Sequence, residues 1–97
     1  VYAIPIGGFV IRQRSCASGS GSTFVQGFLD SQWKAGMSQD ECENFVKTAV
    51  ALAMNRDGSS GGLCRLGILT KKGIERKVFR MDRATLPAVN DPSVYSY

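Results

Sequence analysis

The sequence contains no histidine, and its apolar runs are short. Without histidine, the chain can supply neither a Ser-His-Asp or Cys-His nucleophile nor a histidine-ligated metal site. No stretch approaches the roughly 18 consecutive apolar residues that a membrane-spanning helix needs. We therefore expect no cofactor, no metal and no membrane association, and any hydrolytic chemistry has to use a base other than histidine.

Cysteine is also scarce, with only three residues, Cys16, Cys42 and Cys64. They lie far apart and lack the CxxC spacing that is typical of zinc sites. Their odd number argues against a disulfide framework. We interpret them as small, buried apolar residues of a protein in a reducing compartment.

The 97 residues are 43% hydrophobic and 21% charged, which is the composition of one globular domain at most. The net charge is +4, and basic residues gather near the end of the chain, at Lys71, Lys72, Arg76, Lys77, Arg80 and Arg83. Such a cluster is one signature of nucleic-acid binding. However, it lacks the regularly interleaved aromatic residues that stack on bases. The sequence therefore favours a solvated hairpin, with a small basic nucleic-acid-binding module as the alternative.

The clearest secondary-structure signal predicts a helix from about 39 to 56. Ser38 followed by Glu41 is a capping box. Apolar residues then recur every three or four positions and form one stripe. Its members are Cys42, Phe45, Val46, Ala49, Leu52 and Ala53. We expect Gly58 to end this helix as a left-handed cap.

Strands are expected before and after two helices. The β-prone segment 2–15 should begin its strand after Pro5, because proline cannot donate to a sheet. A short helix is expected over 23–34, ended by Ala35-Gly36, with Gly27 packed closely against a neighbour. A strand at 63–70, with Cys64, Leu66 and Ile68 on one face, should turn at 71–73 and return at 74–79. This order indicates the α+β class.

Two glycine-serine clusters, at residues 18–22 and 56–62, occupy turns beside the helices. If the two turns meet, Ser20, Asp57 and Ser60 can form a hydrogen-bonded trio whose carboxylate holds or tunes a nucleophile. The alternative is that glycine and serine serve turn geometry and that Asp57 bonds to nearby backbone. Spacing alone favours this structural alternative.

The same residues carry a resemblance to a known family. GSGSTFVQGFLD, followed by the 39–56 helix and then by RDGSSGG, resembles the second half of a 20S proteasome β subunit. The similarity runs from VYAIPIGG to GIERKVF in the hairpin, which is nearly the whole chain to about residue 80. ALAM before RDGSSGG is most similar to the β1, caspase-like catalytic type.

The resemblance implies an α+β fragment of the four-layer α/β/β/α sandwich of N-terminal nucleophile hydrolases. In this family a threonine at the mature N-terminus attacks the peptide carbonyl, and its own amine or a nearby water serves as base. No histidine is needed. The family residues that fix the threonine amine match Ser20, Asp57 and Ser60, with Gly61 next in the motif. The resemblance therefore implies supporting catalytic roles for these three residues.

The nucleophile itself has no counterpart here. Val1 is not threonine, and the family's threonine, partner aspartate, lysine and oxyanion-hole segment belong to the first half of the domain. We therefore expect residues 1–97 to be the C-terminal half of a β-subunit domain, with a core at 1–80 and an extended arm at 81–97. Alone, this half should be inactive, and it should self-associate or require the missing half because a sheet edge and a helix face lie uncovered.

The resemblance also implies a cellular setting. The intact subunit would be a threonine endopeptidase that hydrolyses unfolded polypeptides, mainly after acidic residues, in the cytoplasm and nucleus. Its partners would be the other proteasome α and β subunits, with neither nucleic acid nor membrane. A basic nucleic-acid-binding module and a purely structural domain are the competing hypotheses.

Overall fold

The computed structural model describes residues 1–81, which form two helices, a 3-10 helix and two small antiparallel sheets. In chain order the elements are β1 (Tyr2–Ala3), β2 (Ile11–Arg12), η1 (Ser22–Phe24), α1 (Gln26–Gln32), α2 (Gln39–Arg56), β3 (Leu63–Thr70) and β4 (Gly73–Arg80). Strand β1 pairs with β2, and β3 pairs with β4. The predicted α+β class is confirmed, whereas residues 82–97 of the arm expected at 81–97 lie outside the described residues.

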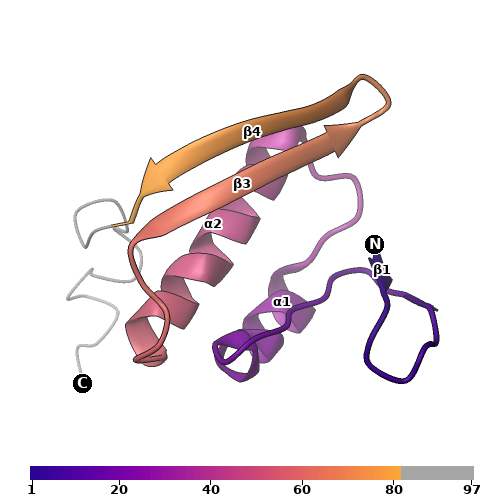
Figure 1. Ribbon diagram of the computed structural model, residues 1–97. Helices are drawn as coiled ribbons and strands as arrows, with labels where there is room; N and C mark the ends of the chain where they lie inside the picture. The colour runs from indigo at the N-terminus through magenta and orange to yellow at the C-terminus, as the bar shows by residue number, and fades with distance from the viewer. Residues whose placement is uncertain (82–97) are drawn as a thin grey trace.

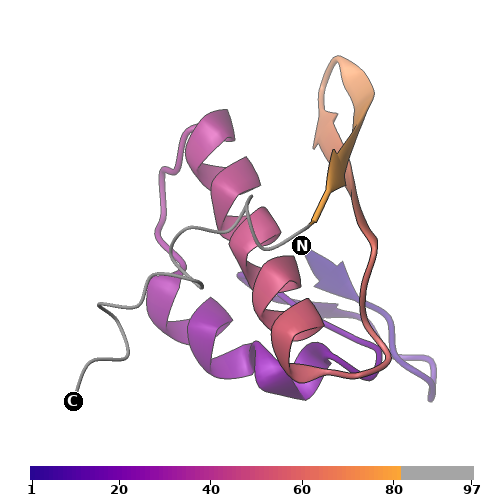
Figure 2. The ribbon, with the colours of Figure 1, turned by 90° about the vertical axis from the view of Figure 1, so that its left-hand side faces the viewer.

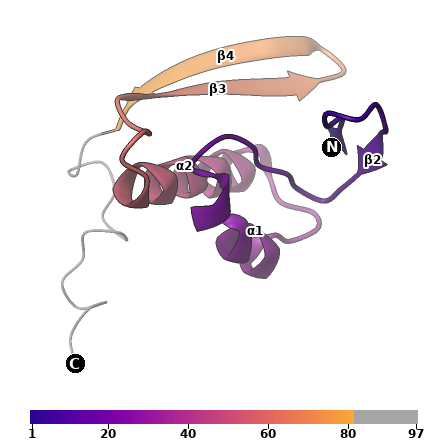
Figure 3. The ribbon, with the colours of Figure 1, turned by 60° about the horizontal axis from the view of Figure 1, so that its bottom comes forward.

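Helix α2 is the centre of the arrangement. The β3–β4 hairpin crosses one side of α2 (Figure 1), and α1 lies on the other side (Figures 2 and 3). Between the two helices, Val25, Leu29 and Ala49 form the buried cluster. The rings of Phe28 and Phe45 stack beside it with their centroids 5.5 Å apart. This small apolar contact fixes α1, and the turn that precedes it, against α2.

The hairpin packs on α2 through alternate residues of β3. Cys64 and Leu66 are buried on β3, and Ala51 is buried on α2, which contacts this strand. The strand predicted at 63–70, with Cys64, Leu66 and Ile68 on one face, is therefore confirmed, and Ile68 is partly buried. The return strand is one residue longer at each end than expected and starts at Gly73.

Charged side chains tie the second hairpin strand to the same helix. Lys77 Nζ on β4 lies 2.9 Å from Glu43 Oε1 on α2. The ammonium of Lys47 lies 3.8 Å from the centre of the Phe79 ring. One member of the basic cluster at 71–83, Lys77, is thus engaged with α2.

The bounds of α2 agree with the prediction, but its expected cap does not. Ser38 Oγ accepts from the Glu41 N–H, and the Glu41 side chain accepts from the Ser38 N–H, so the capping box is complete. The prediction that Gly58 is a left-handed cap is wrong, because Gly58 does not have a positive φ. The cap is Asp57, which leaves the helix with extended backbone (φ −98°, ψ 118°).

The N-terminal strand prediction is wrong in extent and start. Only two residue pairs form, Tyr2 with Arg12 and Ala3 with Ile11. Strand β1 therefore comes before Pro5, and the chain turns at Gly7-Gly8, both of which have positive φ. Strand propensity alone could not fix the extent, because each paired residue needs a partner across the turn.

The short helix also differs from its prediction. It starts as η1, becomes α1 at Gln26 and ends at Gln32, before Trp33 takes extended backbone. The expectation that Gly27 packs closely against a neighbour is wrong, because a Cβ at this position would meet no atom of a neighbouring element within 4 Å.

The expected burial of the cysteines holds for one of the three. Cys64 is buried, whereas Cys16 and Cys42 are exposed, and all three are free thiols. Among residues 1–81, no helix combines the length and hydropathy needed to cross a membrane.

Candidate functional site

The two glycine-serine turns meet at the C-terminal end of α2. Ser20 Oγ donates a hydrogen bond of 2.7 Å to Asp57 Oδ2. Ser60 Oγ donates one of 2.6 Å to the same oxygen. The structure therefore brings together all three residues that the sequence singled out, and we call them the Ser-Asp-Ser trio.

Local backbone geometry places each member of the trio. Asp57 is the first residue after α2, and its carbonyl accepts from the Ser60 N–H at 3.1 Å, which folds Ser60 back toward the carboxylate. Gly19 has φ +90°, a conformation that glycine adopts readily, and its carbonyl accepts from the Ser22 N–H at 3.1 Å. This second turn presents Ser20 to the end of α2 from a point 37 residues earlier in the chain.

Three donors hold the carboxylate in its ionised form. The Ser60 and Ser20 hydroxyls and the Ser59 backbone N–H, which donates to Oδ1 at 3.2 Å, lower the pKa of Asp57. Hydrogen bonds to the charged form of an acid favour that form. Asp57 is therefore a fixed negative charge at neutral pH.

The hydrogen bonds to Asp57 fix which way the Ser20 and Ser60 hydroxyls donate. Because their protons lie toward Asp57, the lone pairs of Ser20 Oγ and Ser60 Oγ are left to accept from another donor. An amine, an ammonium group or a water molecule has the N–H or O–H groups that such a site accepts. Among residues 1–81, no group of three or more His, Cys, Asp or Glu side chains could hold a metal ion.

Gly21 is also part of the site, although it was not among the site residues predicted from the sequence. A Cβ at this position would lie 3.0 Å from Ala53 Cβ, 3.1 Å from Ser60 Oγ and 3.4 Å from Asp57 Oδ2. Its φ is −83°, which any residue can adopt. The GSGS motif was a signal of closely approaching backbone, but only the packed structure distinguishes this glycine from those that serve turns.

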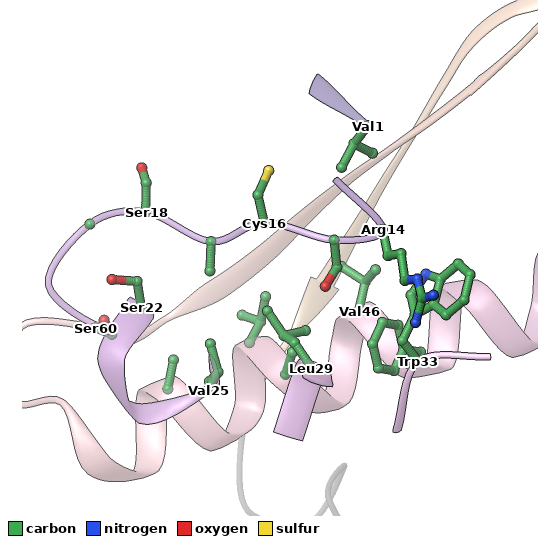
Figure 4. A pocket seen from close by; sticks show the side chains of 18 of the residues that line it. Val1, Arg14, Cys16, Ser18, Ser22, Val25, Leu29, Trp33, Val46 and Ser60 are labelled. Carbon is green, nitrogen blue, oxygen red and sulfur yellow. The ribbon is translucent and has the colours of Figure 1, made fainter. Parts of the chain in front are cut away.

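A groove of about 650 Å³ begins at the trio. It lies between the segment 14–22 and the helices α1 and α2, and its lining includes Val25, Leu29, Phe45, Val46, Ala49, Val50, Ala53 and Met54. Ser60 and Ser22 stand at one end of the groove, and Arg14 stands by Trp33 at the other (Figure 4). Ser20 and Ser60 line the groove and Asp57 does not, so hydroxyls rather than the carboxylate border this mostly apolar cavity.

Comparison with known proteins identifies the family. Residues 1–69 match the family model described as proteasome subunit. The chain belongs to the proteasome subunit family. The two helices and the small antiparallel sheets of this proteasome subunit sequence are accordingly an α+β fragment of the N-terminal nucleophile hydrolase fold.

Relatives with curated descriptions agree with this membership. The chain is 52% identical over 84 residues to a probable proteasome subunit beta type-1 of Schizosaccharomyces pombe, covering 87% of this chain and 37% of the relative. It is 51% identical over 78 residues to the proteasome subunit beta type-6 of Dictyostelium discoideum, covering 80% and 36%. It is 48% identical over 73 residues to the human proteasome subunit beta type-9, covering 75% and 33%. The chain thus spans about a third of the length of these β subunits.

Proposed function

We propose that this chain is part of a β1-type threonine endopeptidase subunit of the 20S proteasome, in which the Ser-Asp-Ser trio supports the N-terminal threonine. The observation that carries the proposal is the pair of hydrogen bonds from Ser20 and Ser60 to Asp57. These bonds join two motifs that are far apart in the sequence and that match the family's supporting residues. Turn geometry alone does not require a contact between them.

The chemistry follows from the polarity of the trio. The serine oxygens accept from the N–H groups of the threonine's terminal amine and hold that amine beside the threonine hydroxyl. When the amine takes the hydroxyl proton it becomes an ammonium group, and the negative charge of Asp57 stabilises this positive charge. The threonine oxygen is then free to attack a peptide carbonyl. The trio orients the base, and it forms no bond to the substrate.

The nucleophile is proposed to come from residues that this sequence does not contain. None of its residues matches the family's threonine, aspartate or lysine of the active centre, so these 97 residues alone should show no peptidase activity. In the proposal they are the C-terminal half of the domain, and the rest of the subunit supplies the reacting group.

Cleavage type and setting complete the proposal. The β1 type rests on ALAMNRDGSSGG and on relatives named beta type-1, type-6 and type-9. A subunit of this type would cleave unfolded polypeptides after acidic residues. It would assemble with the other α and β subunits and act in the cytoplasm and nucleus.

The test is Asp57→Asn in the assembled proteasome. Loss of the carboxylate removes the charge that stabilises the protonated amine, and we expect a fall in hydrolysis of peptides with an acidic residue before the cleaved bond of about 10²-fold or more. Asp30→Asn is the matched control, because Asp30 is an exposed carboxylate on α1. Peptides cleaved by the other catalytic subunits serve as internal controls.

Two results would contradict the proposal. If Asp57→Asn leaves cleavage after acidic residues unchanged in a fully assembled particle, the trio has a purely structural role. If cleavage after basic or apolar residues falls instead, the supporting role stands and the β1 assignment is wrong.

A further inference from the structure

We infer that Gly21 is a positioning residue: its missing side chain lets the 19–22 turn close on α2 and so sets the two hydrogen bonds of the Ser-Asp-Ser trio. This inference rests on the proposed function for what the trio does. It concerns a residue that contributes no functional group of its own and acts only through Ser20, Asp57 and Ser60.

The need at Gly21 is for space and not for backbone freedom. Its φ of −83° lies in the ordinary helical region, unlike the φ of +90° at Gly19. The position where a Cβ would stand is surrounded by Ala53 Cβ at 3.0 Å, Ser60 Oγ at 3.1 Å and Asp57 Oδ2 at 3.4 Å. Two of these three atoms form the shorter hydrogen bond of the trio, of 2.6 Å.

Neighbouring glycines lack this crowding. A Cβ at Gly58 or Gly61 in the other turn, or at Gly27 on α1, would meet nothing within 4 Å. The close approach is therefore specific to the point where the 19–22 turn touches α2 and the trio.

The expected displacement is large relative to the tolerance of the trio. Carbon atoms in contact prefer separations of about 3.5–4.0 Å, so an added methyl group 3.0 Å from Ala53 Cβ must move away by a few tenths of an ångström, up to about 0.5 Å. A hydroxyl-to-carboxylate hydrogen bond weakens beyond about 3.0 Å. The Ser20 Oγ to Asp57 Oδ2 distance is 2.7 Å, and a shift of about 0.5 Å takes it past that limit. Gly21→Ala should thus loosen the trio while every one of its functional groups stays present.

The first measurement is an NMR titration of the selectively labelled Asp57 carboxyl in the intact subunit within the assembled proteasome. Wild type, Gly21→Ala and Gly27→Ala are compared, and the last variant makes the same chemical change in open space. We expect the pKa of Asp57 to rise toward its ordinary value in Gly21→Ala because serine donors are withdrawn, and to stay at the wild-type value in Gly27→Ala. A folded Gly21→Ala variant whose Asp57 titrates as in wild type overturns the inference.

A second variant covers the case in which Gly21→Ala does not fold. Ala53→Gly removes the atom 3.0 Å away and leaves the contact to Ser60 Oγ in place. We expect Gly21→Ala/Ala53→Gly to fold and still to show a raised Asp57 pKa, because the added methyl group still stands 3.1 Å from Ser60 Oγ, the donor of the shorter hydrogen bond. A folded double variant with the wild-type pKa overturns the inference equally.

Activity in the assembled proteasome completes the test. A misplacement of about 0.5 Å is expected to lower kcat for peptides with an acidic residue before the cleaved bond by about 10-fold, with KM changed little. If Gly21→Ala shifts the Asp57 pKa but neither it nor Asp57→Asn changes activity, the proposed function fails and the positioning role stands. If Asp57→Asn abolishes activity but Gly21→Ala changes neither quantity, the positioning role fails and the proposed function stands.

Discussion

Replacement of Leu29 by alanine measures how much of the fold depends on the contact between α1 and α2. Leu29 is 6% exposed and lies in the buried cluster with Val25 and Ala49. Large-to-small changes of this kind cost about 2–5 kcal/mol. Leu29 also borders the open groove, so it has fewer neighbours to lose than a fully enclosed leucine. We expect a loss near the lower end, about 2–3 kcal/mol.

Urea denaturation of the chain provides the assay. With a slope of about 1–2 kcal/mol/M for a small domain, this loss lowers the midpoint of unfolding by about 1–3 M. Leu69→Ala is the matched control, because Leu69 is 77% exposed and the chemical change is identical. The control should stay within about 0.5 kcal/mol of wild type. Equal midpoints for the two variants, with unchanged slopes, would refute the assignment of Leu29 to the core.

Two further predictions concern acid and thiols. The pKa of Asp57 is lower in the folded chain than in the unfolded chain. The ionised carboxylate therefore stabilises the fold at any pH above its unfolded-state pKa, and this stabilisation is lost as the pH falls through its folded-state pKa. The difference in unfolding free energy between wild type and Asp57→Asn should therefore shrink below about pH 4, and a difference independent of pH would argue against the trio. With a thiol reagent, Cys16 and Cys42 should react in the native chain, whereas Cys64, which is 3% exposed, should react only after unfolding. Equal rates for all three thiols would contradict the packing of β3 on α2.

Local signals predicted α2 well because everything that defines this helix lies within it. The Ser38–Glu41 capping box fixed its start, and the three-to-four-residue apolar repeat fixed its length. The β3–β4 hairpin was also predictable, because its turn is short and both strands are adjacent in the chain.

The errors occur where contacts between distant residues decide the outcome. The extent of the β1–β2 pairing depends on partners across a turn, and the exposure of Cys16 and Cys42 depends on which faces are covered. The prediction of Gly58 as the cap was wrong because Asp57 ends the helix instead, and its carboxylate accepts a hydrogen bond from the Ser59 N–H in the following turn.

The candidate site shows the same division. The residue types of the trio were visible in the two motifs, but the distances that join them were not. Spacing alone favoured a structural role for Ser20 and Asp57, and the structure brings their side chains within 2.7 Å. The crowding around Gly21 involves α2 and both turns at once, so no window of the sequence contains it.

The separation between Ser20 and Asp57 also has a consequence for the order of folding. Helix α2 and the β3–β4 hairpin form from neighbouring residues, whereas the trio closes a loop of 37 positions. Such long-range contacts form late, since the chain must first lose the entropy of closing the loop. The site should accordingly open in local fluctuations that leave the helix and the hairpin intact, and its amide hydrogens should exchange before theirs.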